Sequence, residues 1–247
     1  MPKGNMVTKD EFLGGKLLIQ QPSQGHRSGH DAVLLAASVP ESARHICELG
    51  SGVGVASLCA AFRLGHVNVT GVEVNQVHYH LAQENTELNQ LSSRVQFICD
   101  DIYQKPEGLK AAQFDHVFFN PPFYAPAQVK ALEDASKEQA HHIEADHLDK
   151  WFKYAAYLLK AKASLSVIHR ADAIDMLLPI IKRRFGGLKI LPIYGRNGQS
   201  ANRIIISGQR DSKAVSQILP PLYLQNEAGG PSVAAEAILR GGAALAL

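Results

Sequence analysis

The sequence predicts an α/β fold in which a mostly parallel, doubly wound sheet has helices on both faces. Two observations lead to this prediction. Short apolar segments typical of buried strands alternate with helical patterns from His45 onward, and a glycine-rich loop joins the first of these strands to a helix. Strands separated by helices of this length form βαβ units, whose strands are parallel. Sheets of this kind bind ligands at the carboxyl ends of their strands.

The alternation predicts a seven-stranded sheet and a set of helices around it. The strands are expected at residues 45–49, 67–72, 95–99, 116–119, 164–168, 189–193 and 203–207. The helices are expected at residues 29–37, 55–64, 76–89, 145–159, 171–185 and 232–240. Only the Gly- and Asn-containing stretch 194–200 separates the last two strands, so we expect them to form an antiparallel hairpin at the edge of the sheet.

The length of 247 residues fits a single domain. We expect an N-terminal covering segment (1–44), a core (45–209) and a C-terminal extension (210–247). Residues 1–15 lack the apolar segment of a signal peptide. No stretch is apolar for long enough to cross a bilayer, so we expect no membrane partner.

The cysteines and histidines indicate neither a disulfide nor a metal. Cys47, Cys59 and Cys99 show no C-x-x-C spacing and each lies in an apolar segment, which predicts buried free thiols in a cytoplasmic protein. Several histidines lie on polar helical stretches without Cys or carboxylate partners at ligand spacing, so we expect a solvated surface and no metal. These histidines are His78, His80, His141, His142 and His147.

The charge is low overall but unevenly distributed. The net charge is only +2, which does not favour a general polyelectrolyte binder. The segment from Lys182 to Lys213, however, contains eight Lys and Arg residues and only one acid, Asp211. Such a segment either contacts a phosphate backbone or forms a solvated face that balances acids elsewhere, and charge alone does not distinguish the two.

The glycine-rich loop has the spacing Gly50-Ser51-Gly52-Val53-Gly54. Glycines permit a tight turn and a close approach of the backbone to a ligand, and the helix that follows presents free N–H groups. A dinucleotide site would have glycine at position 55, where Val55 stands. The spacing G-x-G-x-G with Glu48 before it is the pattern of methyltransferases that bind S-adenosylmethionine, whose cationic amino group Glu48 can pair with. The alternative is a strand-to-helix turn without a ligand.

Acidic residues also follow the second and third expected strands. Glu73 ends the second strand, where a carboxylate can accept both hydroxyls of a ribose. Asp100 and Asp101 follow the third strand, where an acid can accept an adenine amino group. Each has a simpler alternative, a solvated strand end for Glu73 and a helix cap for the aspartates. Acids at three successive strand ends favour a binding site.

The fourth strand ends in Asn120-Pro121-Pro122-Phe123. The prolines fix the backbone of this turn, so its carbonyl groups have a defined direction. An amine on a planar ring is a poor nucleophile because its lone pair is delocalised. The Asn120 side-chain oxygen and the Pro121 carbonyl can accept its hydrogens and draw the nitrogen toward tetrahedral geometry, while Phe123 stacks the ring. The alternative is a rigid turn with no catalytic role.

These motifs resemble the class I methyltransferases that carry an N-P-P-[FY] motif. The run from Arg27 to Ala36 resembles the Arg-x-x-x-Asp-Ala-Val-Leu-Leu-Ala signature of the bacterial tRNA(Val) adenine N6-methyltransferase family, and the similarity covers nearly the whole chain. The resemblance implies a Rossmann-like fold, with Asn120 and Pro121 holding the target amine and Phe123 stacking the base. It implies a cofactor site made by Arg27, Glu48, Gly50, Gly52, Gly54, Glu73, Asp101 and Asn120.

One departure leaves a question open. Relatives often have Gly-Asp where this chain has Asp100-Asp101, so either aspartate could face the cofactor adenine. The N-P-P-[FY] motif also does not distinguish the amine of adenine in RNA from guanine N2 in rRNA or from a glutamine amide in a release factor. Enzymes of the last two kinds usually carry a substrate domain before the motif, and we expect only a short segment here.

The leading hypothesis is therefore methylation of adenine N6 in a tRNA. A catalytically silent RNA-binding module is the hypothesis from a different class. The long excursion 121–145 after the fourth strand is expected to shape the substrate site. The cations expected to contact RNA are Arg183, Arg184, Arg196 and Arg203. The oligomeric state is left open by the sequence.

Overall fold

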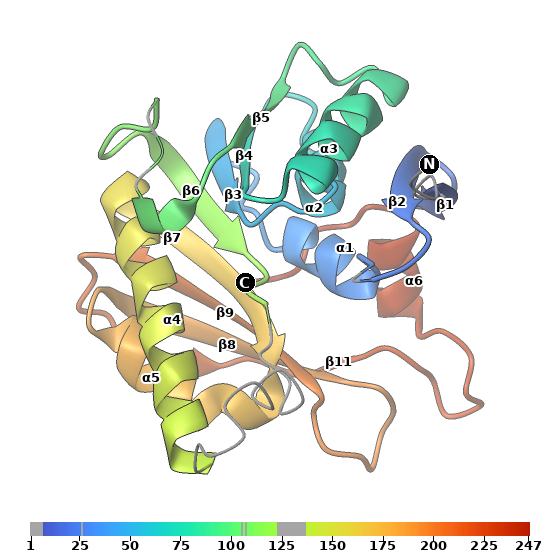
Figure 1. The fold of residues 1–247 in the computed structure, drawn as a ribbon. Helices are drawn as coiled ribbons and strands as arrows, with labels where there is room; N and C mark the ends of the chain where they lie inside the picture. The colour runs from blue at the N-terminus through green and yellow to red at the C-terminus, as the bar shows by residue number, and fades with distance from the viewer. Residues whose placement is uncertain (1–6, 26, 105, 107, 123–136) are drawn as a thin grey trace.

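The computed structural model describes residues 7–25, 27–104, 106, 108–122 and 137–247, and no side chains within 137–143. A nine-stranded sheet forms the centre of the molecule (Figure 1), with the order β10-β8-β9-β7-β6-β3-β4-β5 and with β11 also paired to β8. Its strands are β3 (His45–Leu49), β4 (Asn68–Glu73), β5 (Val95–Cys99), β6 (Phe114–Phe119), β7 (Leu159–Arg170), β8 (Phe185–Tyr194), β9 (Arg203–Arg210), β10 (Gln217–Ile218) and β11 (Leu222–Tyr223).

Helices cover both faces of this sheet (Figure 1). One face carries α1 (His30–Ala37), α2 (Val55–Arg63) and α3 (Gln76–Leu88). The other face carries α4 (Lys137–Leu158) and α5 (Ile174–Lys182). The last helix, α6 (Val233–Leu239), packs against α1, so the C-terminal part of the chain contacts the N-terminal part.

The alternation of side chains along β6 divides the core into two layers. Phe118 is fully buried in the cluster with the α1–α3 side, whereas Val117 and Phe119 are fully buried in the cluster with α4 and α5. Successive side chains of a strand point to opposite faces, so a strand covered on both sides must be apolar at every position. The continuous apolar pattern Val117–Phe119 follows from this requirement.

The seven strands expected from the sequence are all present, and β3 to β7 run parallel. The expected hairpin is confirmed, because β8 and β9 are antiparallel with Ile193 opposite Arg203. It does not form the edge of the sheet, however. The short strands β10 and β11 pair in parallel with the outer side of β8, and sequence analysis did not predict them.

Several boundaries differ from those expected: α4 begins at Lys137 rather than at 145, and β6, β8 and β9 are each longer than expected. β7 spans Leu159–Arg170 rather than 164–168, because its N-terminal part continues directly from α4 and pairs with β6 as far back as Phe114. The expected helix 171–185 is a 3-10 turn (Ala171–Ala173) followed by α5, and Phe185 already belongs to β8. The buried Phe185 side chain fits the apolar pattern of either element, so the pattern alone does not place the boundary.

A separate hairpin precedes the core and was not predicted. Its strands are β1 (Val7–Phe12) and β2 (Leu17–Pro22), which pair antiparallel. Two side-chain amides bind the outer edge of β2, one in α3 and one on the residue that follows it. Asn89 bonds the backbone N–H and C=O of Leu18 at 2.9 and 2.8 Å, and Asn85 bonds those of Gln20 at 2.7 and 3.0 Å. Helix α3 thus takes the place of a neighbouring strand.

The three cysteines are unpaired, but they are not all buried. Cys47 and Cys59 are buried, and burial raises the pKa of both thiols well above the usual range. Cys99 is exposed, contrary to expectation, because it is the last residue of β5 and β5 is the edge strand of the sheet. Among the described residues, no helix is both long and apolar enough to span a bilayer.

Candidate functional site

The central strands end level with one another at their carboxyl edge. One row of paired residues crosses four neighbouring strands: Phe119, Leu49, Val72 and Ile98. The residues that follow this row therefore lie side by side: Asn120, Gly50, Glu73 and Cys99. Register alone brings the glycine loop, the two acidic strand ends and the Asn-Pro-Pro turn to one edge of the sheet, as the sequence predicts.

The glycine loop needs glycine at three positions. Gly50, Gly52 and Gly54 have φ values of +64°, +55° and +88°, which L side chains rarely adopt. Gly54 is also the residue immediately before α2, and a Cβ there would lie 2.7 Å from the ring of Phe97. A Cβ on Gly52, by contrast, would meet no atom within 4 Å. Gly52 therefore borders open space, where a ligand can approach its backbone.

Glu48 is a buried acid whose proton is retained by its surroundings. Its side chain is 4% exposed, and its Oε2 accepts hydrogen bonds from the backbone N–H of Ser57, at 2.8 Å, and from the Ser57 hydroxyl. Burial raises the pKa of Glu48 to about 8, opposed by the bonds from Ser57 and aided by the charge of Glu73. No described Lys or Arg forms an ion pair with it. A cationic group bound nearby would favour the ionised form.

Glu73 closes the glycine loop. Its Oε2 accepts the backbone N–H of Gly52 at 2.7 Å, and its Oε1 accepts that of Asn75 at 2.9 Å. A carboxylate oxygen has a second acceptor site, so Glu73 can still accept hydroxyl groups from a ligand. The solvated strand end considered above does not describe Glu73, which is only 8% exposed.

Asp100 and Asp101 both border the same pocket, and both have a local role. Asp101 accepts the backbone N–H of Tyr103 at 2.9 Å and so begins the 3-10 turn Ile102–Gln104, as a capping residue does. Asp100 accepts the N–H of Asp101 at 2.7 Å. Each bond uses one oxygen, Oδ1, of each carboxylate. The choice of the aspartate that faces an adenine stays open.

Asn120 presents an unused acceptor. Its Oδ1 is buried and has no hydrogen-bond partner within the part of the chain that the structure describes. Buried polar atoms are nearly always paired, so an unpaired one in a residue that borders a pocket indicates a ligand position. Pro121 is buried next to it, and Pro122 is exposed. Phe123 lies outside the described residues, so its role in stacking stays a prediction.

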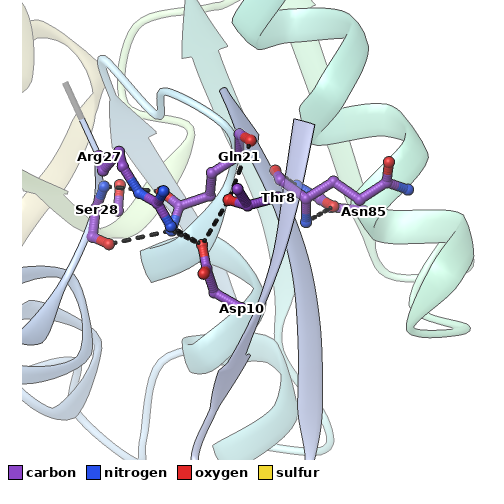
Figure 2. A network of polar contacts seen from close by, with 7 residues as sticks. Thr8, Asp10, Gln21, Arg27, Ser28 and Asn85 are labelled. Carbon is purple, nitrogen blue, oxygen red and sulfur yellow. Dashed lines mark hydrogen bonds and ion pairs between the residues drawn. The ribbon is translucent and has the colours of Figure 1, made fainter. Parts of the chain in front are cut away.

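One pocket of about 510 Å³ is bordered by most of these groups: Glu48, Gly50, Gly52, Glu73, Asp100, Asp101, Asn120 and Pro121. Gly54 is not among its lining residues, so its contact with a cofactor stays a prediction. The N-terminal segment supplies another part of its wall through Ser28, Ala32 and Leu35. The expectation that this segment covers the site is consistent with that position. Arg27 itself is not among the lining residues. Its guanidinium pairs with Asp10 at 2.5 Å, on the hairpin β1–β2 (Figure 2), and its contact with a cofactor stays a prediction.

Two aromatic residues of the pocket were missed by sequence analysis. Trp151 of α4 and Tyr103 both border the pocket, and the Trp151 indole N–H donates to the Tyr103 hydroxyl at 3.0 Å. The same hydroxyl lies 3.0 Å from Nδ1 of His147. Trp151 is the only tryptophan of the chain and is 6% exposed. The helical pattern of the sequence indicates that Trp151 is buried, but it does not indicate that Trp151 borders the pocket.

The four arginines expected to contact RNA fall into two groups. Arg183 and Arg184 both pair with Asp149 of α4, at 3.1 and 2.8 Å. They precede β8, which is parallel to β7 and β6, so they lie toward the amino edge of the sheet, away from the pocket. Arg196 follows β8 and Arg203 begins β9, so both lie at the carboxyl edge. Arg203 pairs with Asp31 of α1 at 2.8 Å.

Comparison with known proteins places this site in a family. The model of the family described as the methyltransferase small domain matches residues 28–171, which is more than half of the chain. The chain belongs to the methyltransferase small domain family. The protein is accordingly an S-adenosylmethionine-dependent methyltransferase, and the matched region contains the glycine loop, Glu73 and the Asn120-Pro121 turn.

Curated relatives of this methyltransferase carry a common name. A protein of Shewanella halifaxensis, 30% identical over 152 residues, and one of Yersinia pestis, 35% identical over 147 residues, are both named tRNA1(Val) (adenine(37)-N6)-methyltransferase. The alignments cover 61% and 56% of this chain. They span 61% and 58% of the length of those relatives, which is less than two thirds.

Solved structures support the fold. A protein of Agrobacterium tumefaciens described as a "predicted O-methyltransferase" superposes with a TM-score of 0.73 and 26% identity, over 88% of this chain and 99% of that one. A tRNA (m1A58) methyltransferase of Aquifex aeolicus superposes with a TM-score of 0.53 at 17% identity, over 78% and 73% of the two chains. At that identity, the second comparison speaks for the Rossmann-like methyltransferase fold alone.

Proposed function

We propose that this methyltransferase transfers a methyl group to the exocyclic N6 of an adenine in a tRNA. The observation that carries the proposal is the buried Asn120 Oδ1, which has no partner among the described residues and borders the same pocket as the glycine loop. An acceptor of this kind holds the N–H of an amine. The names of the curated relatives support the choice of adenine in tRNA.

The residues of the pocket fit S-adenosylmethionine. Glu48 offers a buried carboxyl without an ion-pair partner among the described residues, which suits a cationic amino group. Gly52 borders open space, so the backbone of the loop can be approached closely. Glu73 and the aspartates 100 and 101 supply further acceptors for hydroxyl and amino groups. The cofactor, when bound, supplies an electrophilic methyl group on a sulfonium.

The chain's own contribution to the reaction is positioning. Asn120 Oδ1 and the carbonyl of Pro121 accept the two hydrogens of the target amine, which localises the nitrogen lone pair and aims it. Fixed dipoles in a pocket need no reorganisation when charge develops, and alignment of the reacting atoms removes much of the entropic barrier. The Asn120 amide is not a base, so the proton of the product leaves after methyl transfer.

The atom that receives the methyl group distinguishes this proposal from one of its alternatives. A substrate hydroxyl, which the description of the Agrobacterium protein suggests for that protein, has one hydrogen and needs a base to remove it. Asn120 can accept a hydrogen bond but is not a base, so it suits a nitrogen rather than a hydroxyl. A guanine amine of rRNA or a glutamine amide of a release factor presents two hydrogens, as adenine does. The geometry of Asn120 therefore does not distinguish these substrates from adenine, and the experiment below does.

The test uses the purified chain, S-adenosylmethionine with a labelled methyl group, and a cell extract divided into a sample with ribonuclease and one without. We expect label in tRNA, absent after ribonuclease, and recovered as N6-methyladenosine by nucleoside mass spectrometry. Label in N2-methylguanosine would move the substrate to guanine. Label that survives in protein would replace the RNA substrate by a protein amide, and no transfer together with normal cofactor binding would favour a silent binding module.

A further inference from the structure

A polar network joins the hairpin β1–β2 to Ser28 (Figure 2), which borders the pocket. Gln21 of β2 is its centre, and it is buried, with 2% of its surface exposed. Its Oε1 accepts the backbone N–H of Ser28 at 2.8 Å, and its Nε2 donates to the backbone carbonyl of Ser28 at 3.2 Å. One side-chain amide thus pairs with both backbone groups of Ser28, as a neighbouring strand would.

The same amide is held in place from the other side. Nε2 of Gln21 also donates to Oδ2 of Asp10 at 2.8 Å, and that oxygen accepts the Arg27 guanidinium at 2.5 Å. Gln21, Asp10 and Arg27 therefore fix the residues on both sides of the peptide that joins Arg27 to Ser28 (Figure 2). None of these three side chains borders the pocket, whereas Ser28 does.

Ser28 begins the part of the wall that the N-terminal segment supplies. Ala32 and Leu35 border the pocket from α1, which starts two residues after Ser28. Helix α1 is itself held by the packing of its buried residues and by the Asp31–Arg203 ion pair at 2.8 Å, whereas Gly29, just before it, has no capping side chain. A displacement of Ser28 would therefore move the part of this wall that precedes α1 relative to the glycine loop.

We propose that Gln21 is a positioning residue for the cofactor site: by pairing with the backbone of Ser28, it sets the place of Ser28 in the pocket wall, next to Ala32 and Leu35 of α1. The proposal rests on the proposed function in one respect, because it takes this pocket as the place of the cofactor. Gln21 does not touch the cofactor. Its role is to hold the wall in the geometry that binds, before binding takes place.

Asn89 provides a matched control. It bonds the same strand, β2, through the backbone of Leu18 at 2.9 and 2.8 Å, but at the end remote from Ser28. Asn89→Ala and Gln21→Met both remove side-chain amide bonds that attach to the hairpin. Only Gln21→Met removes the bonds to Ser28. A role of the hairpin in stability alone would affect both variants in the same way.

The experiment measures affinity for S-adenosylhomocysteine by calorimetry, together with urea unfolding and hydrogen exchange of the segment 27–35. We expect Gln21→Met to raise the Kd about tenfold, as the loss of roughly one or two net hydrogen bonds would, and to speed exchange in this segment. Asn89→Ala should lower stability to a similar degree with an unchanged Kd. Gln21→Asn keeps an amide with both donor and acceptor on a shorter side chain and should be intermediate.

Each outcome is decisive. An unchanged Kd in Gln21→Met, or an equal rise in Gln21→Met and Asn89→Ala, would overturn the proposal while leaving the cofactor site in place. If Gln21→Met does not fold, the comparison of Gln21→Asn with Asn89→Ala decides in the same way. Failure of the wild-type chain to bind S-adenosylhomocysteine would instead remove the pocket assignment, and this proposal with it.

Discussion

Gly50 and Trp151 are in such close contact that no side chain fits between them. A Cβ on Gly50 would lie 2.6 Å from Cη2 of the Trp151 indole, which is well inside the distance of real contacts. The glycine loop and helix α4 thus meet at one point of the pocket wall. Helix α4 follows the Asn-Pro-Pro turn and the long excursion in the chain. The contact therefore links the glycine loop to the segment that begins at the Asn-Pro-Pro turn.

The Gly50–Trp151 contact predicts a coupling that a double-mutant cycle can measure. Gly50→Ala should destabilise the fold both by the positive φ, at about 1–3 kcal/mol, and by the clash with the indole. In a Trp151→Ala background the clash is gone and only the φ strain is left. Urea unfolding of the four proteins should therefore give a non-additive cycle. Additive effects would mean that the loop moves away from the indole without cost.

Gly52 allows a test in which a second glycine of positive φ controls for backbone strain. Gly52→Val places a side chain in the open space of the pocket, and Gly198→Val places the same side chain in open space in the loop between β8 and β9, where φ is +79°. Both variants should lose stability through the positive φ. Only Gly52→Val should lose binding of S-adenosylhomocysteine in calorimetry. Equal affinities in the two variants would place the ligand elsewhere.

The buried Glu48 predicts a pH dependence of stability. Its pKa is raised from about 4.5 to about 8 in the folded chain, chiefly by burial. Between these values the folded state keeps a proton that the unfolded state has lost. The stability due to the protonated form is therefore fully present below the lower value and is lost as the pH rises toward about 8. Glu48→Gln should show a flatter profile in urea unfolding across this window.

The same group predicts a proton release on binding. A cationic amino group beside Glu48 favours the carboxylate, so below about pH 8 binding should release a proton and should strengthen as the pH rises. Calorimetry in buffers of different ionisation enthalpy measures this release directly. The release should disappear in Glu48→Gln. If it persisted there, another group would be its source.

Asn120 should matter for turnover rather than for affinity. Asn120→Ala removes an acceptor for the target amine and should lower kcat by about two orders of magnitude or more, with a cofactor Kd within a few-fold of the wild-type value. Asn120→Asp keeps acceptor oxygens at the same position and should retain more activity than Asn120→Ala. A normal kcat in Asn120→Ala, measured at saturating cofactor and RNA, would show that Asn120 only stabilises the turn.

The position of the arginines predicts which of them affect RNA binding. Arg196 lies at the carboxyl edge of the sheet, with the pocket, whereas Arg183 lies toward the amino edge and pairs with Asp149. Arg196→Glu should therefore raise the KM for tRNA and reduce its salt dependence. Arg183→Glu should change both less. A larger effect of Arg183→Glu than of Arg196→Glu would place the RNA on the surface that carries the end of α5 and the start of β8.

Much of the site could be predicted because its residues follow strands. The parallel strands β3, β4, β5 and β6 were correctly expected, and their register alone sets Gly50, Glu73 and Asn120 next to one another. Asp101 illustrates how far such an argument extends. Its position at the pocket was foreseen, and so was the alternative of a capping role, but only the bond to Tyr103 shows that one of its oxygens caps the turn.

The missed features depend on contacts between distant parts of the chain. The hairpin β1–β2 has polar residues along β1 and is held by hydrogen bonds from Asn85 and Asn89. The apolar pattern of the sequence therefore does not predict this hairpin. Trp151 reaches the pocket because of the way in which α4 packs against β6 and β7, and helical periodicity does not determine this packing. Cys99 was expected to be buried because β5 is apolar, but whether a strand is central or at the edge is a property of the whole sheet.

The attachment of β2 to α3 has a consequence for the behaviour of the protein at high concentration. Four residues along a helix advance about 6 Å, and two residues along a strand advance about 6.6 Å, so amides one turn apart match alternate residues of an extended chain. Asn85 and Asn89 exploit this near-equality to occupy the outer N–H and C=O groups of β2. A strand edge occupied in this way is closed to edge-to-edge pairing with a second molecule. Removing both amides should therefore expose a nucleus for aggregation, even under conditions where the rest of the molecule stays folded.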